Sequence, residues 1–151
     1  MSELKDLYEN SGYIPYTRRE DVNVESLKGK EFVDIYIDTQ KRYIMFKLNT
    51  GEILWMDHTQ DCCEDVCIND VCGDIADLLN SHIVHFEERT SEIKENKDDI
   101  QYEDHSGTWT FYDIQTLKGS VNIRWVGLSN GYYSESVDFY KINSIKKEDN
   151  K

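Results

Sequence analysis

Apolar and polar residues alternate along most of this chain, a pattern typical of half-buried β-strands. It predicts strands within residues 32–38, 43–48, 52–57, 66–68, 82–89, 108–111, 121–125 and 133–139. Turn residues such as Asn49-Thr50-Gly51 separate them. We expect the last three to follow one another as antiparallel neighbours, with Tyr133, Glu135 and Val137 on one face of the final strand.

One segment follows a helical period instead. Ile75, Leu78 and Leu79 stand at positions i, i+3 and i+4, and Asp74 precedes them as a capping residue. The sequence therefore predicts an α+β fold, in which curved antiparallel sheets accompany one short helix at 75–80. We expect an N-terminal extension at 1–27, a single domain at 28–145 and a charged tail at 146–151.

The charge of the chain narrows the range of partners. Its 151 residues carry 30 acidic and 17 basic side chains, a net charge of -13. Free nucleic acid and anionic membranes are disfavoured, because both need cationic contacts. Residues 91–106 form an acidic stretch that we expect to be a mobile or functional loop. Without an apolar leader or a long apolar run, the sequence predicts a cytoplasmic protein.

The four cysteines, Cys62, Cys63, Cys67 and Cys72, do not have the spacing of a metal site. Adjacent cysteines chelate one ion poorly, so we expect reduced thiols without metal. His82 and His85 are three residues apart, and in a strand that spacing places them on opposite faces. The sequence predicts no bound metal and no cofactor.

No familiar catalytic arrangement is present. The chain lacks a Gly-x-Ser-x-Gly motif, a glycine-rich phosphate loop and a His-Glu-x-x-His motif. No single carboxylate is given a role by its neighbours, so no catalytic residue is predicted. The pattern indicates a protein that acts by binding.

The stretch at 118–139 gathers basic and aromatic residues that suit a flat or anionic ligand. Arg124 and Lys118 would contact an anionic group, while a tyrosine or tryptophan would stack on a base. The predicted ligand-binding residues are Arg124, Lys118, Tyr132, Tyr133, Trp109 and Asn130. The alternative is simple surface packing, with Arg124 paired to Glu135 or Asp138.

Several motifs together resemble an uncharacterised family of small acidic proteins from phages and prophages. They are QDCCE at 60–64, CGD at 72–74, TWTFY at 108–112, KG at 118–119, IRW at 123–125 and SNGYYS at 129–134. The resemblance covers roughly residues 27–140, and Cys67 departs from the family's pattern.

The resemblance to phage proteins implies a role against host defences, in the cytosol of the host cell. One form of that role is to sequester a small nucleotide-derived immune signal. The alternative is an acidic inhibitor that mimics nucleic acid and binds a host defence protein. A homo-oligomer is compatible with either reading.

Overall fold

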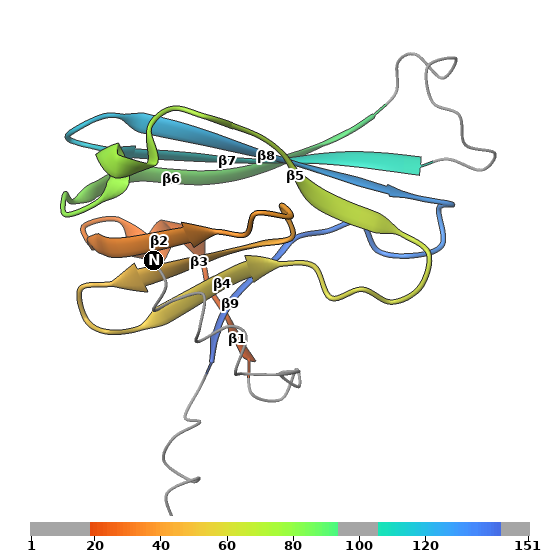
Figure 1. Cartoon of the computed structure of the whole chain (residues 1–151), viewed down its shortest axis with the longest axis horizontal. Helices are drawn as coiled ribbons and strands as arrows, with labels where there is room; N and C mark the ends of the chain where they lie inside the picture. Colours follow the sequence, from red (N-terminus) through yellow and green to blue (C-terminus); the bar gives the residue numbers. More distant parts are fainter. Residues whose placement is uncertain (1–18, 94–105, 143–151) are drawn as a thin grey trace, which may run out of the picture.

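The alternating stretches fold into two antiparallel sheets that pack face to face (Figure 1). This computed structural model describes residues 19–93 and 106–142. The five-stranded sheet has the order β1-β9-β4-β3-β2 and the four-stranded sheet the order β5-β8-β7-β6. The first sheet comprises β1 (Arg19–Asp21), β2 (Phe32–Ile37), β3 (Tyr43–Leu48), β4 (Ile53–Asp57) and β9 (Asp138–Ile142). The second comprises β5 (Asp65–Cys72), β6 (Ile83–Glu92), β7 (Ser106–Thr116) and β8 (Ser120–Ser129).

The core lies between the sheets and is rich in aromatic side chains. Phe139 of β9 packs against Phe46 at 5.7 Å and Phe86 at 5.8 Å between ring centroids, which joins the two layers. Tyr112 and Trp125 are fully buried on the inner face of the four-stranded sheet. Each large apolar side chain buried in this way contributes roughly 1.5–3 kcal/mol, so the core is the main source of stability.

The predicted α+β class is wrong, because the described residues contain no α-helix. Residues 75–80 form only a short 3-10 helix, η3 (Ile75–Leu78), which Asp74 caps as expected by accepting from Ala76 N–H at 3.0 Å. The segment is too short to nucleate an α-helix. It ends at Asn80, whose φ is +57°, and the Asn80 N–H donates to the Phe32 carbonyl at 2.7 Å. A second 3-10 helix, η2 (Val24–Leu27), precedes β2.

The predicted strand at 133–139 is also wrong in its first part. Residues 130–137, here called the crossover, leave the four-stranded sheet and carry the chain to β9 in the other sheet (Figure 1). Turns closed by side chains keep these residues from pairing with a neighbouring strand. Asn130 Oδ1 accepts from the Tyr132 N–H, and Ser129 Oγ accepts from the Gly131 N–H, both at 2.9 Å. Such local bonds compete with strand pairing.

The expected segment boundaries can be compared only in part. Arg19–Asp21 belongs to the sandwich, because β1 pairs with β9. Ser91 and Glu92 end β6 and Ser106 begins β7, so the expected acidic loop reduces to residues 94–105, which lie outside the described residues along with 1–18 and the tail. In the described part of the chain, no helix has the length and apolar character needed to cross a membrane.

Candidate functional site

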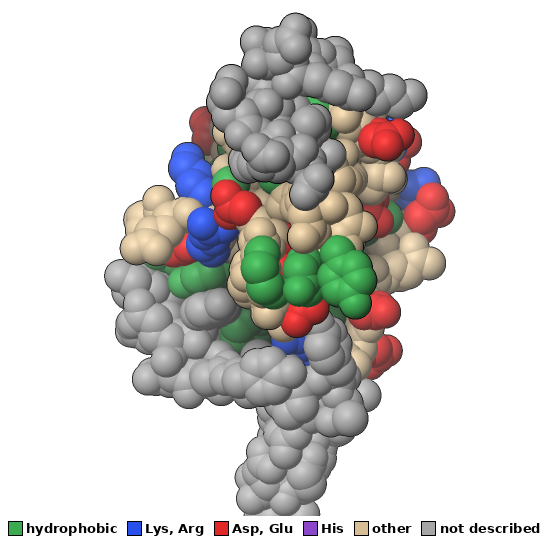
Figure 2. Space-filling model, turned by 90° about the vertical axis from the view of Figure 1, so that its right-hand side faces the viewer, with side chains coloured by type: hydrophobic (Ala, Val, Ile, Leu, Met, Phe, Trp, Pro, Cys, Tyr) green, Lys and Arg blue, Asp and Glu red, His purple; other side chains and the backbone are tan. Residues whose placement is uncertain are grey.

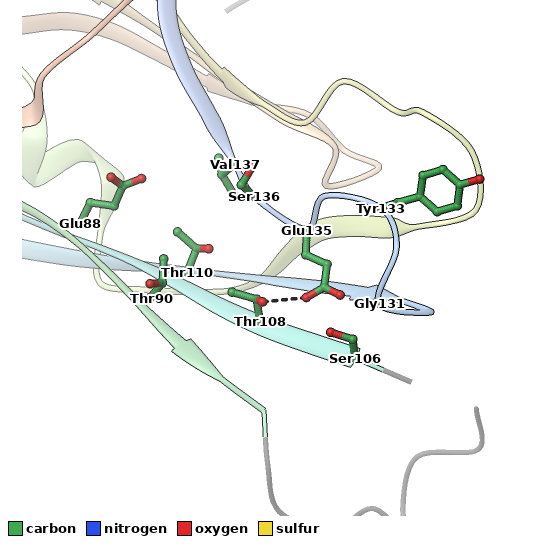
Figure 3. Close-up of a pocket in the computed structure, with 10 residues that line it drawn as sticks. All are labelled: Glu88, Thr90, Ser106, Thr108, Thr110, Gly131, Tyr133, Glu135, Ser136 and Val137. Atoms are coloured by element: carbon green, nitrogen blue, oxygen red, sulfur yellow. Dashed lines mark hydrogen bonds between the residues drawn. The ribbon is translucent and has the colours of Figure 1, made fainter. Parts of the chain in front are cut away.

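The inner face of β7 changes from apolar to polar along its length, and a recess begins where it changes. Ile114 and Tyr112 are buried in the core, but the positions before them on the same face are Thr110, Thr108 and Ser106. The recess has a volume of about 520 Å³. It is lined by Glu88, Thr90, Ser106, Thr108, Thr110, Gly131, Tyr133, Glu135, Ser136 and Val137 (Figure 3).

The recess lies at one end of the sandwich, here called the open end, where the crossover covers the four-stranded sheet. Threonine and serine side chains of β6 and β7 project from the sheet, and Glu135 reaches towards them from the crossover (Figure 3). The ring of Tyr133 extends away from them (Figure 3). Seen from this end, acidic side chains lie around a small group of hydrophobic ones (Figure 2).

Two carboxylates in the recess are held by hydroxyl groups. Thr108 donates to Glu135 Oε1 at 2.6 Å, and Ser129 donates to Glu135 Oε2 at 2.5 Å. The Tyr112 hydroxyl donates to Glu88 Oε2 at 2.6 Å. Burial and the neighbouring carboxylate raise the pKa of Tyr112, so its hydroxyl keeps the proton that it donates. Both carboxylates are therefore fixed as acceptors with lone pairs to spare.

A glycine lets the crossover approach the sheet. Gly127 of β8 faces inward, and a Cβ built on it would lie 2.6 Å from the Glu135 carbonyl oxygen and 2.8 Å from the Glu135 Cβ. Any other residue would push the crossover outward. Gly127 therefore determines how closely the crossover, which forms one wall of the recess, approaches the four-stranded sheet.

A buried histidine fastens the other end of the crossover. His58 Nδ1 lies 2.7 Å from the Ser136 carbonyl oxygen, and His58 Nε2 lies 2.7 Å from Glu64 Oε2. The His58 and Glu64 side chains are only 4% and 0% exposed. Both ring nitrogens are therefore engaged in hydrogen bonds within the protein. Neither nitrogen remains available to take a proton from a substrate, which gives this pair a structural role.

Glu64 is the acceptor at the centre of the loop between β4 and β5. Burial opposes its ionisation, but hydrogen bonds from His58 and from the N–H groups of Cys62 and Asp61 outweigh that cost and lower the pKa of Glu64 to about 2. A second cavity of about 470 Å³ opens beside this pair. It is lined by Arg42, Asp57, His58, Gln60, Glu64, Asp65 and Val66.

Among the described residues that line the second cavity, Arg42 carries the guanidinium group, and it is already paired. Arg42 Nη1 lies 2.8 Å from Asp65 Oδ1, and this bond raises the pKa of Arg42. Nearby, Asp57 and Asp138 stand directly opposite each other on β4 and β9. Burial raises the pKa of both carboxyl groups, although Tyr140 donates to Asp57 Oδ2 at 2.9 Å. The second cavity thus offers an anion little uncompensated positive charge.

The structure separates the residues predicted to share one ligand site. Arg124 lies on the outer face of the four-stranded sheet, with its guanidinium carbon 4.9 Å from the Trp109 ring centroid. Its Nε donates to Asn69 Oδ1 at 2.8 Å, and not to Glu135 or Asp138 as the packing alternative expected. This pair is the part of the predicted site that the fold brings together.

The remaining predicted residues lie at the two ends of β8. Lys118 is exposed in the turn before it, and Asn130, Tyr132 and Tyr133 follow it in the crossover. A ten-residue strand is roughly 30 Å long, so Lys118 cannot share a small ligand with the tyrosines. Tyr133 lines the recess, whereas Tyr132 is 82% exposed beside it.

Sequence reasoning missed the residues that build the recess. The alternating pattern assigns Glu88, Thr108 and Glu135 only to strands or to pairing. The available signal was the change from Ile114 and Tyr112 to three hydroxyl residues on one face of a continuous strand. That change indicates that this face of β7 extends beyond the apolar core.

The expectation of four reduced thiols is wrong for two of them. Cys62 and Cys63 form a disulfide in the loop that surrounds Glu64. Cys67 and Cys72 carry free thiols, and burial raises the pKa of Cys67, while a hydrogen bond to Asp70 raises that of Cys72. The adjacent positions of Cys62 and Cys63, which disfavour a metal site, thus allow a disulfide between them.

Comparison with known families gives one match. A family model described as a domain of unknown function, DUF7448, matches residues 25–139. The matched segment begins within η2 and ends in β9. It therefore includes the crossover and the residues that line the recess and the second cavity. No curated protein and no solved structure matches the chain.

Proposed function

The chain belongs to the DUF7448 family, and because that family has no known function, we propose one from the geometry of the recess. The protein acts by binding, and the recess accepts a cationic group from a partner protein. In the phage setting that the sequence motifs imply, the partner would be a host defence protein with a basic surface, and the protein its acidic inhibitor.

The lining of the recess carries this proposal. Two glutamates and the hydroxyls of four threonines or serines surround it, beside Ser136 and Tyr133 at the rim, and none of the described lining residues is Lys or Arg. A phosphate would meet two carboxylates there, whereas an ammonium or guanidinium group would meet carboxylate and hydroxyl oxygens that can accept from it. The net charge of -13 steers a basic partner towards the same surface.

The surrounding groups support binding over chemistry. Each recess carboxylate already accepts from at least one internal hydroxyl, and both nitrogens of His58 are engaged. A general base also needs a proton-transfer partner in reach, and the described lining residues of the recess include no His, Lys or Cys. Fixed acceptors without such a base are typical of a site that orients a charged group.

Calorimetric titration with a hexa-arginine peptide tests the proposal. The wild type should bind it, and the double variant Glu88→Gln/Glu135→Gln should bind about tenfold to a hundredfold more weakly, since a charged hydrogen bond contributes about 1.5–3 kcal/mol. The control is Glu20→Gln/Glu25→Gln, which removes the same charge from exposed positions elsewhere. Equal weakening by both variants would show a general field effect and not a site.

A second candidate is capture of a nucleotide-type signal on the outer face, favoured by the contact between Arg124 and Trp109. The guanidinium would contact phosphate at the edge of the ring. Cyclic dinucleotides should then raise the melting temperature, and Arg124→Ala should weaken the best ligand about tenfold or more. Equal affinity of an intact Arg124→Ala protein would remove this candidate.

A further inference from the structure

We propose that His85, Glu87 and Asp113 form a binding site for a divalent transition-metal ion such as Zn²⁺ on the outer face of the four-stranded sheet. One ligand atom from each of the three residues lies within 4.8 Å of the others. His85 Nε2 is 3.3 Å from Glu87 Oε1 and 3.9 Å from Asp113 Oδ2. This site is separate from the recess and does not depend on the proposed function.

A β-bulge brings the histidine to this face. Ile83 pairs with Thr116 and His85 pairs with Gln115, so Val84 is an extra residue in β6. Ile83 and Phe86 are both buried, while Val84 and His85 point outward. In a regular strand, His85 would share the inner face with Ile83, because side chains alternate along a strand. His82 lies before β6 and pairs instead with Glu31 at 3.4 Å.

The carboxylates favour a cation at this point. Glu87 and Asp113 stand directly opposite each other on β6 and β7, an arrangement in which like charges repel. Arg89 is a cation close to them, with its Nε 3.9 Å from Glu87 Oε2. A divalent ion between the two carboxylates would remove the repulsion, and Arg89 could keep its contact with the second Glu87 oxygen.

The distances fit a small ion with nitrogen and oxygen ligands. Metal–ligand bonds of about 2.0–2.2 Å in a tetrahedron place ligand atoms roughly 3.3–3.6 Å apart. The contact between His85 and Glu87 already meets this spacing, and Asp113 needs to move only slightly. One imidazole with two carboxylates suits Zn²⁺, Co²⁺ or Ni²⁺ better than Mg²⁺ or Ca²⁺. Three protein ligands leave a coordination position open towards solvent.

Calorimetric titration of the full chain with Zn²⁺, repeated with Co²⁺ and read by absorption, tests the site. We expect one ion per chain, with at least tenfold weaker binding in His85→Ala and in Asp113→Asn. His82→Ala is the matched control, since it removes a histidine paired with one carboxylate, and its affinity should equal that of the wild type. The cobalt spectrum should lack the thiolate charge-transfer band.

Three results would overturn the metal site. They are no binding at submillimolar Zn²⁺, unchanged affinity in His85→Ala, or a thiolate band that assigns the ion to the cysteines. Circular dichroism of each variant checks the fold. Glu87→Gln provides an independent variant, because its side chain is 46% exposed and keeps nearly the same shape.

Discussion

The two halves of β7 share one strand and one face, yet they meet different surroundings. At Ile114 and Tyr112 the five-stranded sheet covers the strand, and both residues are fully buried. At Thr108 and Ser106 the crossover covers it, and hydroxyls line a recess. The core half is held by packing of apolar groups, whereas the recess half is held by hydrogen bonds to Glu135 and by the fastening of Ser136 through His58. Packing in the core half thus stabilises the fold, and the recess half of the same strand is where we propose binding.

Truncation at the two halves should have very different costs. Ile114→Ala leaves a cavity in the core and should lower the free energy of unfolding by about 2–5 kcal/mol. Thr108→Ala removes one partly exposed hydroxyl bond and should cost about 1 kcal/mol or less. Urea denaturation measures both values. A cost of several kcal/mol for Thr108→Ala would mean that the recess half belongs to the core.

Gly127→Ala should disturb the recess half selectively. The added methyl group would meet the Glu135 carbonyl oxygen at 2.6 Å and the Glu135 Cβ at 2.8 Å, so the crossover must move, at a cost of about 1–3 kcal/mol. Binding of the hexa-arginine peptide should weaken with it. Val126→Ala, on the outer face of the same strand, should leave peptide binding unchanged. An unaltered affinity in Gly127→Ala would show that the position of the crossover does not shape the site.

The hydrogen bond between His58 and Glu64 should have a smaller, pH-dependent effect on the melting temperature. The pKa of Glu64 falls from 4.5 to about 2, so its stabilisation is fully present above pH 4.5 and is lost as the pH falls towards 2. The melting temperature of Glu64→Gln should therefore be several degrees lower than that of the wild type near neutral pH. This difference, or gap, in melting temperature should close below pH 4.5. Asp61→Asn, an exposed neighbour, should show no such gap. A gap that stays constant down to pH 2 would contradict the role given to the Glu64 carboxylate.

Much of the strand content could be predicted, because alternation is a local property. The predictions at 32–38, 43–48, 52–57 and 82–89 correspond to β2, β3, β4 and β6. The error at 75–80 arose because the apolar spacing was helical, whereas the segment forms only the short 3-10 helix η3, after which Asn80 donates to the Phe32 carbonyl of β2. Nothing in the segment itself reveals that distant partner.

The candidate site was harder to predict for a related reason. Alternation at Tyr133, Glu135 and Val137 is real, but the turns at Asn130 and Gly131 send these residues across to the other sheet. Arg124 lies on the outer face of the four-stranded sheet, where it contacts Trp109. Lys118 and the tyrosines are close in sequence but are separated by a whole strand. The recess depends on which segment covers β7, and that is set by packing between distant segments.

The pairing of β1 with β9 has a consequence for how the protein folds. Arg19 faces Ile142 across the sheet, so the five-stranded sheet joins segments from opposite ends of the described chain. Sheets with such distant pairings fold slowly, in milliseconds to seconds, because loop closure must precede the favourable contacts. The crossover that walls the recess leads directly into β9, so the recess cannot form until this last strand docks. A chain still emerging from the ribosome would therefore lack the recess, and its β4 edge would be open to wrong partners.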